Sequence, residues 1–335
     1  MKKINIKSPI LGKNIRLYLT AFVLIISTII KGDNIKVEPP FWWTHFDDKK
    51  LELMIYSTDV GETKKVKILN DKNKKISSIK LIDIKKTDNK DYLFLELTLS
   101  KKLKPGIYSF QLSGKNKISF DYVFKEKEKN RNYANGFNSS DVIYLLMPDR
   151  FSNGDIKNDN IEGLMAGTNR SKPGLRHGGD FQGIINHLPY LKELGVTAIW
   201  MTPVFINDMP EIAGGYGDHV YGAYHGYAAT DFYQTDPRFG TNEKYKELVD
   251  SAHDLGLKVV MDIIHNHSGD KHWWMTSLPS SDWYNINKNY KTTNYEVAAA
   301  NDPYVSNYDL KHLTEAPFVK EMPDLNQNNP LLQRY

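Results

Sequence analysis

The chain has 335 residues, of which 40% are hydrophobic and 12% aromatic. This composition excludes an intrinsically disordered protein and supplies enough apolar side chains for two cores. The absence of cysteine excludes disulfide bonds and a lipidated cysteine. The net charge of +4 comes from the first 31 residues, because the rest of the chain carries 38 basic against 40 acidic side chains. We therefore expect no nucleic-acid partner.

Residues 1–31 have the pattern of a secretory signal peptide. Basic residues up to Arg16 precede an apolar stretch from Leu17 to Ile30, which is shorter than the ~20 residues that a membrane span needs. The pattern predicts export to the periplasm or the medium, with no stable membrane insertion after cleavage. Ser27–Ile30 form a poor cleavage site, so an uncleaved membrane anchor is the alternative.

Residues 36–125 are predicted to form an antiparallel β-sandwich of the immunoglobulin-like type. Leu93, Leu95, Leu97 and Leu99 alternate with other side chains, which is typical of a half-buried strand, and Leu51–Tyr56 and Ile107–Leu112 are similar. The aromatic run Phe41–Trp43 could stack on sugar rings or belong to the core. A charged segment without apolar residues follows, and we interpret 126–140 as a linker.

After the linker, apolar runs of strand length alternate with helical patterns. Val142–Met147 predicts a parallel strand that is buried on both faces. Apolar residues from Ile184 to Leu194 recur at helical spacing, and Gly195 ends that helix. Strands are expected at Ala198–Met201 and Leu257–Ile264, with a second helix around Tyr245 to Ala252 between them. The order indicates an α/β barrel or a doubly wound sheet.

The periodicity disappears after His265, which predicts an irregular inserted lobe. The expected organisation is a signal peptide (1–31), a β-sandwich (36–125), a linker (126–140), three β/α units (141–267), an inserted irregular domain (268–325) and a lead-in to a fourth strand (326–335).

Polar residues follow the third predicted strand and form the first candidate site. Asp262, Asn266 and His267 offer a carboxylate, an amide and an imidazole at one strand end. A core aspartate that pairs with neighbouring backbone groups is the simpler reading for Asp262. His265, His267, Asp270 and His272 also invite a zinc hypothesis, but their spacing differs from that of a binuclear zinc site.

A second candidate site follows the first predicted strand. Asn153, Asp155, Asn158 and Asp159 place oxygen ligands close together, as a hard cation such as Ca²⁺ prefers. Their order does not match an EF-hand loop, and an ordinary Asn/Gly/Asp turn is the alternative.

Five segments in this order resemble the α-amylase superfamily, glycoside hydrolase family 13, and most of all its neopullulanase and cyclomaltodextrinase branch. They are YLLMPDRFSNGD, GGDFQGIINHLPYLKELGVTAIWMTPVF, HGYAATDFYQTDPRFGT, MDIIHNH and MPDLNQNNP. The resemblance covers nearly all of 37–335. It implies a TIM barrel with an inserted domain after strand 3, which hydrolyses α-1,4-linked glucans of starch, pullulan or cyclodextrins by a retaining mechanism.

The resemblance also implies roles for single residues. Tyr227 corresponds to the tyrosine that stacks on the sugar in subsite −1, His267 to the histidine that binds its hydroxyl groups, and His225 lines the same pocket. Asp262 corresponds to an aspartate that pairs with an arginine of strand 4. The family's nucleophilic Asp and acid/base Glu would follow Tyr335, so we expect the chain by itself to be inactive.

The same resemblance implies a calcium site. Its ligands correspond to Asn153, Asp155, Asn158, Asp159, Asp180 and the carbonyl of Gly178. The main prediction is therefore an α-glucan hydrolase with a Ca²⁺ site. A non-catalytic glucan-binding protein is the alternative, and the sequence leaves open both the preferred glucan and whether two copies form a homodimer.

Overall fold

A computed structural model describes residues 35–46, 48–127, 136–213, 220–285 and 292–335. The predicted signal peptide and most of the predicted linker lie outside these ranges. The described residues form two compact units, the first made mainly of residues from 41 to 126 and the second mainly of residues that follow. In the described part of the chain, no helix is long and apolar enough to cross a membrane.

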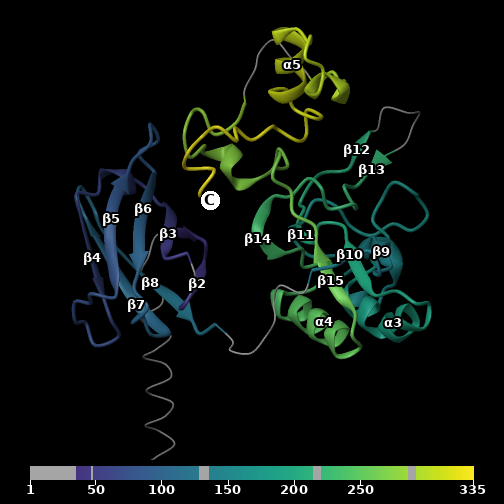
Figure 1. Ribbon diagram of the computed structural model, residues 1–335, viewed down its shortest axis with the longest axis horizontal. Coiled ribbons are helices and arrows are strands. Elements are labelled where there is room, and N and C mark those ends of the chain that lie inside the picture. Colours follow the sequence, from purple (N-terminus) through teal and green to yellow (C-terminus); the bar gives the residue numbers. More distant parts are fainter. Residues whose placement is uncertain (1–34, 47, 128–135, 214–219, 286–291) are drawn as a thin grey trace, which may run out of the picture. The chain divides into compact units, whose positions relative to one another are not determined.

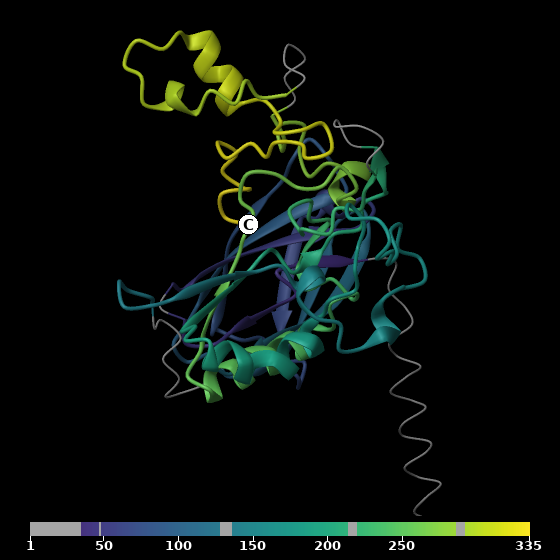
Figure 2. The same ribbon diagram turned by 90° about the vertical axis from the view of Figure 1, so that its right-hand side faces the viewer.

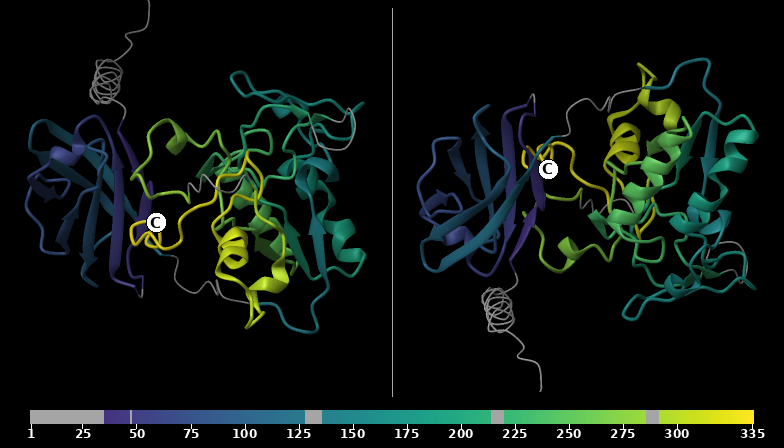
Figure 3. Two further views of the ribbon diagram at one scale, coloured as in Figure 1. Left: turned by 90° about the horizontal axis from the view of Figure 1, so that it is seen from above. Right: turned by 90° about the horizontal axis from the view of Figure 1, so that it is seen from below.

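The first unit consists of two four-stranded sheets that form its two layers (Figure 3). One sheet has the order β1-β3-β6-β5 and the other the order β2-β8-β7-β4. The strands are β1 (Lys36–Glu38), β2 (Phe41–Trp43), β3 (Lys50–Tyr56), β4 (Lys65–Leu69), β5 (Ile79–Lys85), β6 (Tyr92–Leu99), β7 (Gly106–Ser113) and β8 (Lys117–Lys125). Leucines of β3 and β6 and aromatic residues of β7 and β8 build one shared core.

Strand β6 is more deeply buried than its alternating pattern predicts. Leu93 and Leu95 belong to the core, but Tyr92 and Phe94 on the opposite face are also fully buried. Tyr92 lies opposite Tyr56 of β3, with ring centroids 4.9 Å apart. The prediction of a half-buried strand is therefore wrong at the start of β6, where the side chains on both faces are buried.

The second unit contains a parallel sheet with the order β15-β10-β9. Its strands are β9 (Ile143–Leu146), β10 (Ala198–Met201) and β15 (Lys258–Met261). Helices α3 (Phe181–Glu193) and α4 (Asn242–Asp254) pack against each other beside this sheet (Figure 1). Their apolar stripes form the core with the sheet, as the helical spacing predicts.

Polar caps define where the two helices begin. The Asp180 carboxylate accepts a hydrogen bond from the Gly183 N–H at α3, and the Thr241 hydroxyl accepts one from the Lys244 N–H at α4. Gly195 has a φ of 89°, a conformation that favours glycine, and it follows the last turn of α3.

One face of the parallel sheet is uncovered, contrary to the prediction that Val142–Met147 is buried on both faces. Leu145 is 59% exposed and Trp200 is 40% exposed. The two residues pair in register, so both project from the same face. Within the described ranges the helices cover only the other face, and β9 and β15 have no partner on their outer edges.

Shorter elements complete the second unit. They are α2 (Pro148–Phe151), β11 (Phe205–Ile206), β12 (Ile212–Ala213), β13 (Val220–Tyr221), β14 (Asp231–Thr235) and α5 (Asn307–Thr314). Helix α5 lies in the segment that we expected to be irregular, and it packs against a short 3-10 turn at Val297–Ala300 (Figure 2). The Ser306 hydroxyl caps its first turn, which explains why a helix begins there.

Candidate functional site

Asp262 follows β15 directly and receives two hydrogen bonds from other elements. The Tyr227 hydroxyl donates to Asp262 Oδ2 at 3.0 Å, and the Trp200 indole N–H donates to the same oxygen at 3.1 Å. Tyr227 comes from the loop before β14 and Trp200 from β10. The carboxylate therefore joins three segments at the uncovered face of the parallel sheet.

Two histidines fix the backbone of Tyr227. His267 Nε2 lies 2.9 Å from the Tyr227 carbonyl oxygen, and the Tyr227 N–H donates to His225 Nδ1 at 3.1 Å. The rings of His225 and Tyr227 are 5.6 Å apart. The structure thus brings together the four residues Tyr227, His225, Asp262 and His267, which we call the tyrosine cluster.

The hydrogen bonds and burial of the tyrosine cluster define its protonation. Burial, together with the nearby His267 and Arg176, lowers the pKa of His225 to about 4, and burial also lowers the pKa of His267. Both imidazoles are therefore neutral at pH 7. A neutral His267 donates from Nε2 to the Tyr227 carbonyl, while His225 accepts at Nδ1 and carries its proton on Nε2. Burial and the bond to Asp262 raise the pKa of Tyr227.

Gly226 allows the loop of Tyr227 to approach the end of β10. Its φ is 87°, and a Cβ at this position would lie 2.0 Å from the carbonyl oxygen of Pro203. A side chain would push the loop away from the sheet. The close approach places Tyr227 within reach of Asp262.

The second candidate site lies where residues 153–159, here called the asparagine loop, meet the start of α3. The Asp180 carboxylate accepts hydrogen bonds from the N–H groups of Gly154, at 3.1 Å, and of Asp155, at 2.8 Å, besides capping α3. Asn158 Nδ2 lies 3.5 Å from Asp180 Oδ2. Asp180 therefore ties the asparagine loop to the helix.

Two side-chain oxygens of the asparagine loop need a further partner. Asn153 Oδ1 and Asn158 Oδ1 are buried and have no hydrogen-bond partner among the described residues. Asn153 Nδ2 donates to Asp159 Oδ1 at 2.5 Å, and a Cβ on Gly178 would lie 2.5 Å from that same Asp159 oxygen. Orphaned buried oxygens beside a carboxylate fit a hard cation. The six predicted ligands lie on two segments, residues 153–159 and 178–180, that Asp180 joins by hydrogen bonds.

The cation hypothesis depends on the amide oxygens. In the described part of the chain, no three His, Cys, Asp or Glu side chains are grouped so that they could hold a metal ion. Asp155 Oδ1 accepts the Lys157 N–H and begins a short 3-10 turn at Ile156–Asn158.

The histidines of the zinc hypothesis do not form a common site. His265 is exposed, whereas His272 is fully buried and its ring lies 4.2 Å from that of Trp274. His272 Nδ1 accepts the Trp274 N–H and begins the 3-10 turn at Trp273–Thr276. His272 thus has a structural role in the inserted lobe.

A buried network of charges, which the sequence patterns did not predict, adjoins the two candidate sites. Asp149, Arg176, Asp236 and Arg238 are each at most 2% exposed. Arg238 binds both Asp236 oxygens at 2.7 and 2.8 Å, and Arg176 lies 3.8 Å from Asp149 and 3.9 Å from Asp236. The available signal was that Asp149, Asp236 and Arg238 lie inside the quoted motifs and that Arg176 lies just before another of them.

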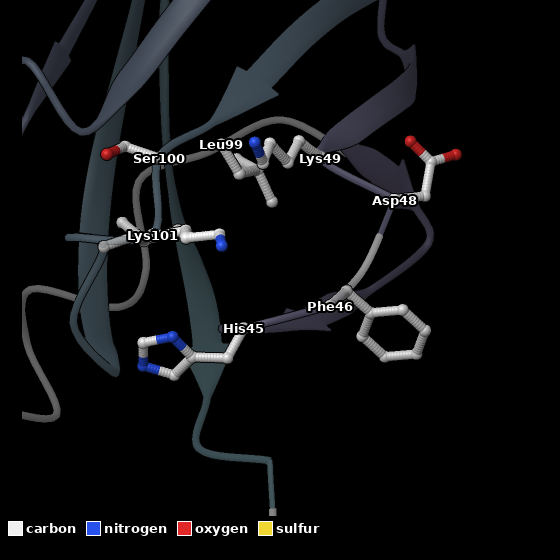
Figure 4. Close-up of a pocket in the computed structure, with 8 residues that line it drawn as sticks. His45, Phe46, Asp48, Lys49, Leu99, Ser100 and Lys101 are labelled. Atoms are coloured by element: carbon white, nitrogen blue, oxygen red, sulfur yellow. The ribbon is translucent and has the colours of Figure 1, made fainter.

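Two cavities of the first unit contain none of the predicted site residues, and the larger one, of about 320 Å³, is lined by Asn70, Ile76, Tyr108 and neighbouring residues. One cavity of about 20 Å³ is lined by His45, Lys101 and neighbouring residues, and the ring of Phe46 points away from it (Figure 4). That volume holds about one water molecule, so it cannot take a sugar. Trp42 packs against the sandwich core, while sugar stacking by Phe41–Trp43 stays a prediction.

Comparisons with known proteins match both units of the chain. The family "Alpha amylase, catalytic domain" matches residues 145–335, and "Cyclomaltodextrinase, N-terminal" matches residues 36–128. The chain is 39% identical over 196 residues to a beta/alpha-amylase of Paenibacillus polymyxa, covering 57% of this chain and 14% of that protein.

Two further relatives are shorter proteins. A cyclomaltodextrinase of Thermoanaerobacter pseudethanolicus is 33% identical, over 62% of this chain and 33% of that protein. Neopullulanase 2 of Thermoactinomyces vulgaris is 35% identical, over 54% of this chain and 30% of that protein. The chain therefore spans a third or less of the length of these curated relatives.

Proposed function

The chain belongs to the α-amylase family, in the branch of neopullulanases and cyclomaltodextrinases, and from this premise we propose that it forms the sugar-binding part of an α-glucan hydrolase. The substrates would be starch-derived glucans, pullulan or cyclodextrins with α-1,4 bonds. We propose that β9, β10 and β15 are the first three strands of a TIM barrel. The uncovered face of their sheet would then face the interior of that barrel.

The arrangement of the tyrosine cluster supports this proposal most strongly. Hydrogen bonds hold Tyr227 at its hydroxyl, its N–H and its carbonyl oxygen, so its ring has little freedom to turn. A fixed aromatic ring can stack on the apolar face of a pyranose ring. The neutral His225 keeps a proton on Nε2 that a sugar hydroxyl can accept.

Retaining hydrolysis requires two carboxyl groups about 5 Å apart. The resemblance gives Asp262 a role other than that of the nucleophile, and both Tyr227 and Trp200 donate to its Oδ2 atom. Its proposed role is to orient Tyr227 and Trp200. The nucleophile and the acid/base would come from later strands of the barrel, so we propose that this chain binds glucans without hydrolysing them.

We also propose a calcium ion at the asparagine loop. Asn153, Asp155, Asn158, Asp159, Asp180 and the Gly178 carbonyl would hold it, and the buried oxygens of Asn153 and Asn158 support this choice. The ion would neutralise the carboxylates and link the loop to α3.

The leader supports a proposal about location. Its basic residues followed by an apolar stretch suggest export to the periplasm or the medium and removal of residues up to about Lys31. The intact mass of the exported protein tests this proposal. A membrane-bound product that retains Met1 would contradict it.

Calorimetric titration with a linear maltooligosaccharide tests the function. We expect binding by the chain and a loss of about tenfold in affinity for Tyr227→Ala. Tyr190→Ala is the matched control, because Tyr190 is exposed on α3 and away from the tyrosine cluster. Equal affinities for both variants would contradict the proposed sugar site. Hydrolysis by the purified chain alone would contradict the assignment of the catalytic carboxyl groups to later strands.

A further inference from the structure

Asp149 holds a turn of the chain that the cation proposal depends on. Its side chain is fully buried and accepts the His177 N–H at 2.9 and 3.1 Å and the Gly178 N–H at 3.4 Å. Its backbone carbonyl accepts the Gly179 N–H at 2.9 Å. One residue at the start of α2 thus binds three consecutive N–H groups of the segment that precedes α3.

Positive charges compensate for the burial of the Asp149 carboxylate. Arg150 Nη1 lies 3.5 Å and Arg176 Nε lies 3.8 Å from its oxygens. Arg176 Nη1 has no hydrogen-bond partner among the described residues. A buried carboxylate requires such partners, and removing one member of a buried charge pair leaves the other uncompensated. The Asp149 carboxylate is therefore buried in the second unit beside two arginines.

The Gly178 peptide has little room to move toward the asparagine loop. Gly178 has a φ of 80°, and a Cβ there would lie 2.5 Å from Asp159 Oδ1 and 2.9 Å from Asn153 Nδ2. The space between this peptide and the two loop side chains is thus too small for a Cβ on one side. On the other side the peptide is held by its hydrogen bonds to Asp149.

We propose that Asp149 is a positioning residue for the cation, and this inference rests on the calcium site proposed above. Asp149 does not bind the ion. It holds the N–H groups of His177 and Gly178 so that the Gly178 carbonyl stays beside Asn153 and Asp159. Partners that orient metal ligands in this way commonly change metal affinity 10- to 100-fold when they are replaced.

The test measures the dissociation constant of Ca²⁺ for the purified chain by calorimetry, with Tb³⁺ luminescence as a second probe. Asp149→Asn keeps the size of the side chain but turns an amide N–H₂ toward N–H groups that need an acceptor. We expect it to weaken Ca²⁺ binding 10- to 100-fold. Asp159→Asn, which alters a proposed ligand, should weaken binding at least as much.

Asp141→Asn is the matched control. The Asp141 side chain is also nearly buried and bound, by Lys258 Nζ at 2.7 Å and by the Thr197 hydroxyl at 2.8 Å, but it lies two residues before β9 and not at the proposed cation site. It should lower the melting temperature without changing Ca²⁺ affinity. A purely structural role of Asp149 would give this same result, so an unchanged affinity in Asp149→Asn would overturn the inference.

Two other results bear on the proposal. A wild-type chain that binds neither ion would overturn both the calcium site and the role of Asp149, while glucan binding by Tyr227 would still be decided separately by the maltooligosaccharide titration. If Asp149→Asn does not fold, hydrogen exchange of the wild type replaces it. We expect slow exchange at His177 and Gly178 that slows further with Ca²⁺, and fast exchange at both amides in Ca²⁺ would overturn the inference.

Discussion

The hydroxyl of Tyr227 and the carboxylate of Asp262 form a 3.0 Å hydrogen bond between residues that are 35 positions apart in the sequence. The bond connects the loop before β14 to the end of β15. Because Trp200 of β10 donates to the same carboxylate oxygen, the orientation of the Tyr227 ring depends on two strands of the sheet. The position of the aromatic ring is therefore fixed relative to the sheet.

Tyr227→Phe keeps the ring and removes this hydrogen bond. We expect the free energy of unfolding of this variant to be about 1 kcal/mol lower than that of the wild type, because this is the usual net contribution of such a bond. Urea unfolding measures the change. Tyr190→Phe on the exposed side of α3 should have no effect, and equal losses in both variants would argue against the bond.

His225 should make stability depend on pH. Its pKa is about 4 in the folded chain and 6.5 ordinarily, so between these values the unfolded chain binds more protons. The free energy of unfolding therefore rises with pH in this window, and this contribution is lost as the pH falls through it. When the pH falls from 7 to 5, the free energy of unfolding should decrease less in His225→Gln than in the wild type, and the difference should be roughly 2 kcal/mol. The exposed His265→Gln serves as the control in the same urea series.

Asp324 should have the opposite dependence. Burial raises its pKa to about 6 from 3.8, although bonds from Asn285 and Asn266 favour the charged form. Between about pH 4 and 6 the folded chain binds more protons at this site, so the free energy of unfolding falls as the pH rises. As the pH rises from about 4 to 6, the free energy of unfolding of Asp324→Asn should thus increase relative to that of the wild type by roughly 2 kcal/mol. In the wild type, the opposite effects of His225 and Asp324 on the free energy of unfolding partly cancel, and only the single variants reveal each effect.

Calcium should stabilise the second unit. Binding only to the folded form adds about 2.7 kcal/mol when the free ion is at about 100 times its Kd. Melting curves with calcium and with chelator should therefore differ in midpoint, and Asp159→Asn should reduce the difference. Identical midpoints for the wild type under both conditions would remove the site.

The uncovered sheet face should make the chain self-associate. Leu145→Lys places a charge among the exposed side chains of β9 and β10, and it should reduce both the sedimentation of larger species and the binding of an apolar dye. Ile107→Lys in β7 is the control, because Ile107 is 53% exposed in the first unit. An equal effect of both substitutions would show that the sheet face is not the cause.

Local patterns predicted the regular elements of this chain well. Strand β10 matches its expected range, and the helical stripe from Ile184 to Leu191 is buried in α3. Residue spacing determines which side of a helix is apolar, so these features can be recognised without tertiary contacts. What covers a strand cannot be recognised in this way, which is why the exposed face of β9 was missed.

In the candidate sites, too, some features were predicted from the sequence and others were found only in the structure. The resemblance supplied the tyrosine cluster and the asparagine loop, and the structure brings the members of each together. The network of Arg176, Asp236 and Asp149 was missed, because its charges are separated by up to 87 positions and pair only after the chain has folded. Nothing in their local sequence distinguishes a buried arginine from an exposed one.

Two glycines in different segments touch each other with no room for a side chain. A Cβ on Gly154 would lie 2.3 Å from the backbone nitrogen of Gly183, and a Cβ on Gly183 would lie 1.9 Å from the carbonyl oxygen of Ser152. Both obstacles are backbone atoms, so no choice of rotamer relieves them. Natural variants and designed libraries should therefore keep glycine at both positions together, even where the oxygen atoms of the proposed cation site change. The pair would identify this loop and helix in distant sequences that lack the side chains of the proposed cation site.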